Sequence, residues 1–281
     1  MKITKDQLKC WNACKDGYGW FLRRFPDGEA EYQDVLNALA EDDRPADADW
    51  LMNLAGPDRE AVLEVDVIAD CKHFFAAGRL VIKTSATVCR RLRAGCGIEA
   101  GRGIKAGCGI EAGEGIKAGW GIKAGEGIEA GEGIKAGRGI KAGDGIKAGC
   151  GIKAGWGIKA GYGIKAGCGI EAGDGIEACW GIKAGDGIEA GEGIEAGWGI
   201  EAGEGIEAGW GIKASEGIKA GCGIKAGDGI EAGWGFGIFA GLRLRLADWS
   251  LYARVIAKDK PANLISGSWV EPDVVTDIDS V

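Results

Sequence analysis

The sequence predicts a mainly β protein: a three-sided parallel β-helix with about 18 residues per coil, a small N-terminal helical domain and a C-terminal cap. Residues 94–237 consist of 24 consecutive hexads of the form Ala-Gly-x-Gly-Ile-Lys/Glu, with departures only at Cys179, Ser215, Phe236 and Gly237. The residues at position x fall into distinct classes when every third hexad is compared. On both sides of this region the glycines disappear while apolar residues continue, which is typical of the ends of a repeat array.

Each hexad predicts one short strand and one corner. Ile and Ala stand two residues apart, so they share one face of a strand, and the Lys or Glu between them points the other way. Strict alternation would also bury x, which is often Asp, Glu or Arg, and a buried unpaired charge is very costly. The alternation is therefore expected to break at Gly-x-Gly, with glycine at positive φ turning the chain and x facing outward.

The coil length follows from the residues at position x. Grouping every third hexad separates the aromatic residues into two columns, which are Trp120, Trp156 and Trp210, and Tyr162, Trp180, Trp198 and Trp234. The third column has no aromatic residue and holds four cysteines, Cys96, Cys150, Cys168 and Cys222. A period of 12 residues gives no such separation. The sequence therefore favours 18 residues per coil, and eight such coils would form a rod of roughly 38 Å.

Residues 1–62 are predicted to form the helical domain. Apolar residues recur at helical spacing over 5–25, with interruptions at Gly17 and Gly19, and again over 29–41. A third short helix is expected over 47–55, ended by a Gly-Pro pair.

The remaining boundaries come from the repeat frame. Residues 63–93 are predicted to be a transition that contains degenerate first coils. When the hexad frame is extended backward from Ala94, its two inward positions stay apolar. The first position is Val88, Ile82 and Ala76, and the fifth position is Leu92, Ala86 and Leu80. The solenoid is thus expected to begin near residue 72. The regular solenoid covers 94–237, a cap containing Trp249, Tyr252 and Trp269 covers 238–270, and an acidic, loose tail covers 271–281.

These motifs carry two resemblances. The repeat resembles the left-handed β-helix of hexapeptide proteins and bactofilin-like polymer-forming β-helices. Hexapeptide proteins place a large aliphatic residue four before a small one; Ile82 and Ala86 follow that order, whereas Ala94 and Ile98 reverse it. The segments 14–21 (CKDGYGWF), 25–28 (FPDG) and Trp50-Leu51 resemble a helical module of uncharacterised bacterial and prophage proteins with Gly-Ile-Lys repeats. The resemblances imply a solenoid with a helical module and no particular activity.

No catalytic, cofactor or metal site is expected. The single histidine, His73, precedes the regular coils, and these coils have no insertions, so a hexapeptide acyltransferase-like enzyme is disfavoured. Gly95-Cys96-Gly97 with Gly101 is one residue too long for the dinucleotide fingerprint, and it recurs in every hexad. Cys10 and Cys14 have no second ligand pair for zinc. We expect a non-enzymatic protein without a small-molecule substrate.

Composition favours a cytoplasmic location. The first residues contain no apolar signal segment, and no stretch is long and apolar enough to span a membrane. Ten cysteines without an export signal are expected to be free thiols in a reducing compartment.

Charge is unevenly distributed along the repeat. Residues 94–168 carry eleven Lys/Arg and seven Asp/Glu, a balance of +4, whereas residues 169–237 carry four and thirteen, a balance of −9. An 18-residue coil also stacks like charges, such as Lys141 on Lys159 and Glu177 on Glu195. The pattern is compatible with a solvated face, with association between rods, or with a nucleic-acid interaction in which the basic part attracts and the acidic part mimics nucleic acid.

The outward aromatic residues are the candidate binding residues. Exposed aromatics in rows are typical of binding surfaces, although stacking that stiffens the corners is an equal alternative. We expect a scaffold or protein-interaction rod that self-associates or binds a protein partner. The alternative is a phage-related inhibitory or decoy protein with an acidic face that mimics nucleic acid.

Overall fold

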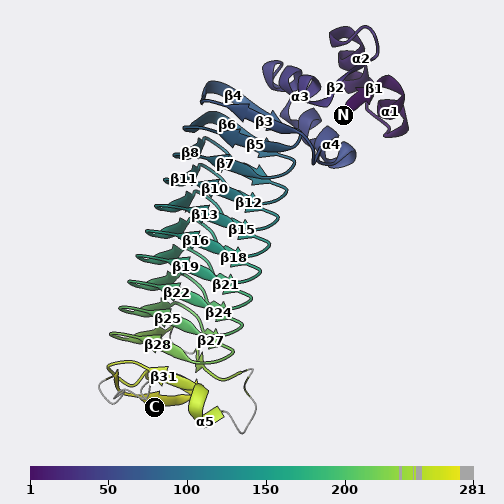
Figure 1. The fold of residues 1–281 in the computed structure, drawn as a ribbon. Helices are drawn as coiled ribbons and strands as arrows, with labels where there is room; N and C mark the ends of the chain where they lie inside the picture. The colour runs from purple at the N-terminus through teal and green to yellow at the C-terminus, as the bar shows by residue number, and fades with distance from the viewer. Residues whose placement is uncertain (234–235, 243, 245–248, 273–281) are drawn as a thin grey trace.

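The repeat forms the expected three-sided solenoid of parallel strands (Figure 1). The structure is a computed structural model, and it describes residues 1–233, 236–242, 244 and 249–272. Over residues 98–214 each strand pairs with the strand 18 residues later, as Ile116 with Ile134 and Ile134 with Ile152. The predicted coil length and parallel sheets are therefore confirmed.

The strands line three faces of the rod. The first face contains β3 (Val62–Val65), β5 (Arg79–Ile82), β7 (Ile98–Ala100), β10 (Ile116–Ala118), β13 (Ile134–Ala136), β16 (Ile152–Ala154), β19 (Ile170–Ala172), β22 (Ile188–Ala190), β25 (Ile206–Ala208), β28 (Ile224–Ala226), β31 (Arg254–Ile256) and β33 (Ser268–Val270). The second face contains β8 (Ile104–Ala106), β11 (Ile122–Ala124), β14 (Ile140–Ala142), β17 (Ile158–Ala160), β20 (Ile176–Ala178), β23 (Ile194–Ala196), β26 (Ile212–Ala214) and β29 (Ile230–Ala232). The third face contains β9 (Ile110–Ala112), β12 (Ile128–Ala130), β15 (Ile146–Ala148), β18 (Ile164–Ala166), β21 (Ile182–Ala184), β24 (Ile200–Ala202), β27 (Ile218–Ala220), β30 (Ile238–Phe239) and β32 (Leu264–Ser266).

Stacked Ile and Ala side chains fill the axis of the rod. Ile158 and Ala160 are each 1% exposed, and the Lys159 between them faces solvent. The same inward, outward, inward pattern recurs in every regular strand, so the assignment of the hexad faces is confirmed. The apolar residues of the degenerate coils, among them Ile82 and Leu92, continue the same core.

The hexad glycines have a different role from the predicted one. Positive φ occurs at Gly28, Gly56, Gly241 and Gly267, and at none of the hexad glycines that the structure describes. Instead, a Cβ at Gly173 would lie 2.0 Å from the carbonyl oxygen of Gly155 in the preceding coil. Glycine therefore allows corners to stack closely, because a side chain there would meet backbone. Cys179 and Ser215 stand at the equivalent hexad position and are exposed.

The N-terminal domain combines four helices with a two-stranded antiparallel sheet. Its elements are β1 (Lys2–Thr4), α1 (Lys5–Cys10), α2 (Lys15–Arg24), β2 (Glu29–Glu31), α3 (Tyr32–Glu41) and α4 (Pro45–Ala55). The segment predicted as one helix with breaks at Gly17 and Gly19 instead breaks at Asn12, whose φ is 57°. Asn tolerates this left-handed conformation, and both glycines lie inside α2. Residues 29–31 form a strand, although they were predicted to start a helix.

The solenoid begins earlier than residue 72. β3 pairs in parallel with β5, so the first face starts at Val62. The long strands β4 (Ile68–Ala76) and β6 (Ala86–Ala94) follow, and each runs through both the second and the third face. β3 carries no recognisable hexad, because its residues include neither the glycines nor the Ile-Lys-Ala triplet.

The helical domain covers the edge of β4. The side-chain amide of Gln33 donates to the Phe75 carbonyl oxygen at 2.8 Å and accepts from the Ala77 amide at 2.9 Å, so it replaces a neighbouring strand. The Phe75 and Ala77 side chains belong to the core of the helical domain, with Phe21 and Leu36. An open sheet edge is a site of unwanted pairing, and this contact closes it.

At the other end, strands β31 to β33 continue the first and third faces. Val255 aligns with Ile224 of the last regular coil, and the Trp269 indole donates to the Ala257 carbonyl at 3.0 Å. The short helix α5 (Trp249–Tyr252) lies beside these strands (Figure 1). The predicted loose tail falls at 273–281, outside the described residues, apart from its first two positions.

Candidate interaction surface

The variable hexad residues form three columns, one along each corner of the rod. We name them by a representative residue. The Trp120 corner lies between the first and second faces, the Trp180 corner between the second and third, and the Cys150 corner between the third and first. Most of these side chains face outward as expected, but Cys96 is buried, because it lies under the start of the solenoid where Glu114 and Arg79 approach it.

The Trp180 corner carries a continuous aromatic stack. The rings of Trp180 and Trp198 are parallel within 6°, with centroids 4.7 Å apart, and Tyr162 meets Trp180 edge-on at 5.2 Å. The three side chains are still 46% to 50% exposed, because stacking along the rod covers ring faces and leaves the outer edges open. Trp234, predicted to belong to this column, lies outside the described residues.

The Trp120 corner alternates aromatic and cationic residues. The guanidinium of Arg138 lies 4.8 Å from the Trp120 ring and 5.2 Å from the Trp156 ring, and Arg102 covers the other side of Trp120 at 5.3 Å. Such cation–π contacts hold the guanidinium planes in place while their N–H groups face outward. This alternation was not predicted, although the order of residues 102, 120, 138 and 156 in one column of the sequence contains it.

Trp210 belongs to the same corner but stands apart from the other rings. Asp174 and Glu192 separate it from Trp156, and it is 61% exposed. The described aromatic residues of both predicted columns therefore lie along their two corners. Among the corner residues that the structure describes, direct ring contacts are confined to Tyr162, Trp180 and Trp198.

The outward Lys and Glu residues form charge ladders. Like charges stack as expected, for example Lys141 on Lys159, and ion pairs form at most of the positions where the sign changes, as between Lys159 and Glu177 at 2.6 Å. The hydrogen bond to Glu177 raises the pKa of Lys159. Within the described coils seven such pairs join neighbouring strands; they are Lys117–Glu99, Lys147–Glu129, Lys153–Glu171, Lys159–Glu177, Lys183–Glu201, Lys213–Glu231 and Lys225–Glu207.

The second face forms a groove between its charge ladder and the Trp120 corner. Gly-Ile segments form its floor, Trp120 and Trp210 line it near opposite ends, and residues 259–262 lie at its C-terminal end. This face is bordered by both aromatic corners, whereas the Cys150 corner, which carries only Cys, Asp and Glu, borders the other two faces.

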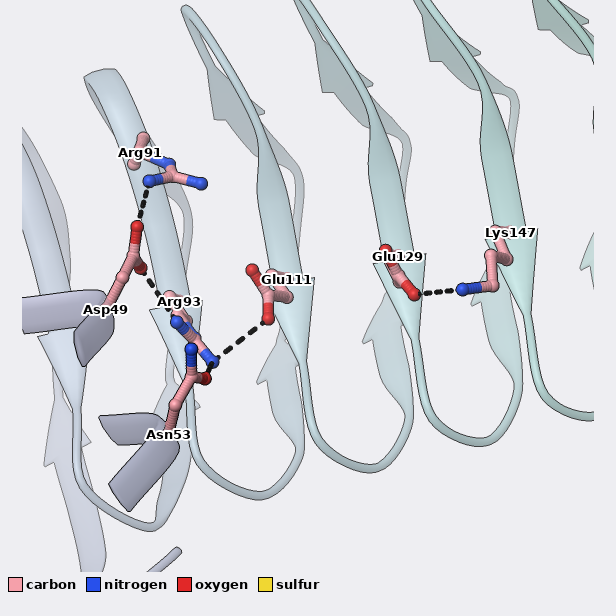
Figure 2. A network of polar contacts seen from close by, with 7 residues as sticks. All are labelled: Asp49, Asn53, Arg91, Arg93, Glu111, Glu129 and Lys147. Carbon is pink, nitrogen blue, oxygen red and sulfur yellow. Dashed lines mark hydrogen bonds and ion pairs between the residues drawn. The ribbon is translucent and has the colours of Figure 1, made fainter. Parts of the chain in front are cut away.

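A network of arginines and carboxylates fixes the helical domain to the rod (Figure 2). Asp49 of α4 contacts both Arg91 and Arg93 of β6, and Arg93 also reaches Asn53 at 2.6 Å and Glu111 of the next coil at 3.2 Å. The same face continues with the exposed pair Glu129 and Lys147 (Figure 2).

His73 lies where the helical domain meets the rod. The residue is buried, and its ring stacks on Phe75 and places Nε2 3.0 Å from an Asp43 carboxylate oxygen. Nδ1 has no hydrogen-bond partner among the described residues. Asp43 also accepts a hydrogen bond from Lys72, which is the main cause of its lowered pKa. These contacts connect α3 and the loop after it to β4.

Other kinds of site are not found in the described part of the chain. Within it, no three His, Cys, Asp or Glu side chains are grouped as ligands for a metal ion. None of the described helices combines the length and the apolar character that crossing a bilayer requires.

Comparison with known proteins matched the helical domain. Residues 1–55 match the family model of the YdhT N-terminal domain, which ends at the last residue of α4. Neither the curated proteins nor the solved structures contained a match to this chain. The chain is therefore similar to that family over its N-terminal module, which is joined here to a β-solenoid.

Proposed function

We propose that this protein is a non-enzymatic scaffold rod that self-associates or binds a protein partner through the two aromatic corners beside its second face. The observation that carries the proposal is the arrangement of six described aromatic side chains, each 46% to 61% exposed: Trp120, Trp156, Tyr162, Trp180, Trp198 and Trp210. Rows of exposed aromatics on one side of a protein are typical of interaction sites.

The rod holds these side chains in fixed positions before any partner arrives. Parallel strands pair along its whole length, and stacking restrains Trp180 and Trp198. Binding to such a preorganised surface loses little conformational entropy, so more of the contact energy is retained as affinity. The proposal places the rod in the cytoplasm, where its cysteines stay reduced.

Replacing the stack tests the proposal. Trp180→Ser, Trp198→Ser and Trp234→Ser together are expected to leave the circular dichroism spectrum unchanged, because corner residues vary widely, and to abolish self-association or partner capture. The matched control changes three exposed residues of the Cys150 corner, Glu132, Asp186 and Glu204, to Ser. Association equal to that of the parent in the tryptophan variant would rule out the aromatic corner as the binding site.

The acidic alternative rests on a different part of the surface. Glu171, Glu189 and Glu207 stack in consecutive coils of the first face, and Glu189 has no ion pair in the described part of the chain. A row of carboxylates at strand spacing can imitate a phosphate backbone. This alternative predicts salt-sensitive capture of a nucleic-acid-binding protein, which Glu189→Lys would weaken while the tryptophan variant would not.

A further inference from the structure

The second face carries opposite charges at its two ends. Along the Trp120 corner the order is Arg102, Trp120, Arg138, Trp156, Asp174, Glu192, Trp210, Asp228. Reversing this column places Arg102 opposite Asp228, Arg138 opposite Glu192, and Trp120 opposite Trp210. Trp156 falls opposite Asp174, a carboxylate that can accept its indole N–H. The column is therefore complementary to its own reverse.

The charge ladder of the same face has the same property about the same centre. Its order is Lys105, Lys123, Lys141, Lys159, Glu177, Glu195, Lys213, Glu231. On reversal, Lys105 meets Glu231, Lys141 meets Glu195, and Lys159 meets Glu177. The remaining position places Lys123 opposite Lys213.

The Trp180 corner completes the match. The same reversal places Tyr162 opposite Trp180 and Trp198 opposite Asp144. Glu126 falls opposite Glu216, and these two glutamates stand three residues after Lys123 and Lys213 on the same coils. The lysine pair Lys123 and Lys213 therefore lies beside the glutamate pair Glu126 and Glu216. Across the interface, each lysine can pair diagonally with the glutamate of the other copy that lies beside the opposing lysine.

We propose that the second face binds the second face of another copy of this chain in antiparallel orientation. The two-fold axis would pass between the coil of Trp156 and the coil of Asp174. This inference rests on the proposed function and specifies its partner, its surface and its register. A face that contacts itself about a two-fold axis must be self-complementary, and the charge matches named above satisfy that condition except Lys123 with Lys213 and Glu126 with Glu216, which compensate each other diagonally.

The charges that the pairing uses are mostly those that lack a partner within the chain. In the part of the chain that the structure describes, Arg102, Arg138 and Lys141 form no ion pair, and neither do Glu192, Glu195 and Asp228. Antiparallel packing gives each of them an opposite charge. Complementary charge contributes register and association rate, while the buried aromatics contribute affinity.

The first and third faces fit themselves less well. Reversal of the third-face ladder brings Lys165 opposite Lys183 at its centre. The first-face ladder does match its own reverse, with Lys153 opposite Glu171 at its centre. Both faces, however, include the Cys150 corner, where reversal brings the carboxylates of residues 114 and 204 together and those of 132 and 186 together.

On the first face, the facing carboxylates of the Cys150 corner are not compensated by lysine. Every lysine of the first-face ladder is already opposite a glutamate of the same ladder. The first face also has an aromatic corner on one side only. A parallel arrangement of any face would place every ladder charge opposite itself. The second face in antiparallel orientation is therefore the best self-match.

The second face is large enough for a stable dimer. Eight coils at strand spacing and one hexad of width give roughly 38 by 18 Å, so two copies would bury roughly 1,400 Å² in total. This value lies within the range of standard specific interfaces.

The test exchanges charges at one predicted contact. Lys141 lies between Lys123 and Lys159, so Lys141→Glu relieves repulsion within the monomer and does not threaten folding. Glu195→Lys lies between Glu177 and Lys213 and is close to neutral within the chain.

Two matched controls change lysines that also lie between two lysines on the other faces. Lys165→Glu is on the third face, between Lys147 and Lys183. Lys135→Glu is on the first face, between Lys117 and Lys153. Both controls should dimerise like the parent. Dimerisation that is weakened by Lys135→Glu and not by Lys141→Glu would assign the interface to the first face and overturn the inference.

Sedimentation equilibrium should show that each single variant at the second face weakens dimerisation at least about tenfold, because the two-fold axis repeats the mismatched contact. The double variant should dimerise like the parent, and an equimolar mixture of the two single variants should form a heterodimer of parental affinity. If the parent dimerises and the mixture of single variants does not, the antiparallel register is wrong while the scaffold proposal stands. A monomeric parent would overturn the inferred dimer. A monomeric parent that also captures no protein partner would overturn both the dimer and the proposed scaffold function.

Discussion

In the regular coils each contact is repeated by the next coil, whereas at the N-terminal junction no two contacts are alike. Ile158 rests between Ile140 and Ile176, and the same arrangement recurs along the axis. At the junction, Gln33 substitutes for a strand, and Asp49 joins two arginines. The comparison shows that the repeated coils are stabilised by a core of interchangeable apolar contacts. The start of the solenoid is instead defined by specific polar residues.

The largest expected effect tests the repeated core. Ile158→Asp should destabilise the solenoid by more than about 4 kcal/mol, because a carboxylate would enter a dry axis without a partner. Urea denaturation followed by circular dichroism measures the change. The neighbouring change Lys159→Glu should leave the unfolding midpoint close to that of the parent, since it replaces an exposed ion pair with Glu177 by an exposed opposite charge beside Lys141. Similar midpoints for the two variants would mean that the inward and outward positions are assigned wrongly.

An intermediate effect is expected at the junction. Gln33→Ala removes both hydrogen bonds to the edge of β4 and should destabilise the docking of the helical domain by about 2–3 kcal/mol, because the Phe75 carbonyl and Ala77 amide lose their partner. Hydrogen exchange at the Ala77 amide should accelerate, while amides of the central coils keep their protection.

Asn37 on the same helix provides the control for this prediction. Its side-chain oxygen accepts a hydrogen bond from Gln33 at 2.9 Å, so Asn37→Ala removes a neighbouring polar contact and leaves both bonds between Gln33 and the strand edge in place. Exchange at Ala77 should then stay close to that of the parent. Uniform acceleration across all coils in Gln33→Ala would show that the junction and the rod unfold as one unit.

The smallest effect concerns pH. The hydrogen bond from Lys72 is the main reason that the pKa of Asp43 lies below the usual value of an aspartate. A carboxyl group with a lowered folded-state pKa stabilises the fold above its unfolded-state pKa, and this contribution is lost as pH falls through the folded-state value. Asp43→Asn should therefore reduce the loss of junction stability between about pH 4 and pH 2 and leave the central coils unaffected. An identical acid profile in the parent and the variant would show that Asp43 does not contribute.

Sequence analysis predicted the repeated part well because the repetition itself carries the information. The alternation of Ile and Ala fixed the inward positions, and the separation of Trp180 from Trp120 indicated three sides. The start of the solenoid at Val62 was missed, since those strands are identified by their pairing with later residues and not by their own pattern. The positive φ expected of the glycines was wrong because the corner is limited by contact between coils, which a single hexad does not reveal.

The interaction surface was predicted in part for the same reason. The aromatic columns follow directly from the 18-residue period, but the stacking partners depend on what occupies the coil above and below. Arg138 becomes informative only when it is placed between Trp120 and Trp156, and Trp210 differs from them because its neighbours are acidic. The residue types at position x reveal the columns, whereas the alternation of Arg and Trp depends on their order along one corner.

The 18-residue coil also limits how a gene for this protein can change in length. Each hexad is an almost perfect copy of its neighbour, so hexads can be deleted or added in whole units. Removal of one hexad would preserve the buried core, yet it would rotate every later corner by one third of a turn; if the lost hexad lay between Trp180 and Trp198, the two stacked rings would be separated. Loss of three hexads would keep all corners aligned. The core therefore tolerates changes in length by single hexads. The surface columns tolerate only changes by whole coils of three hexads.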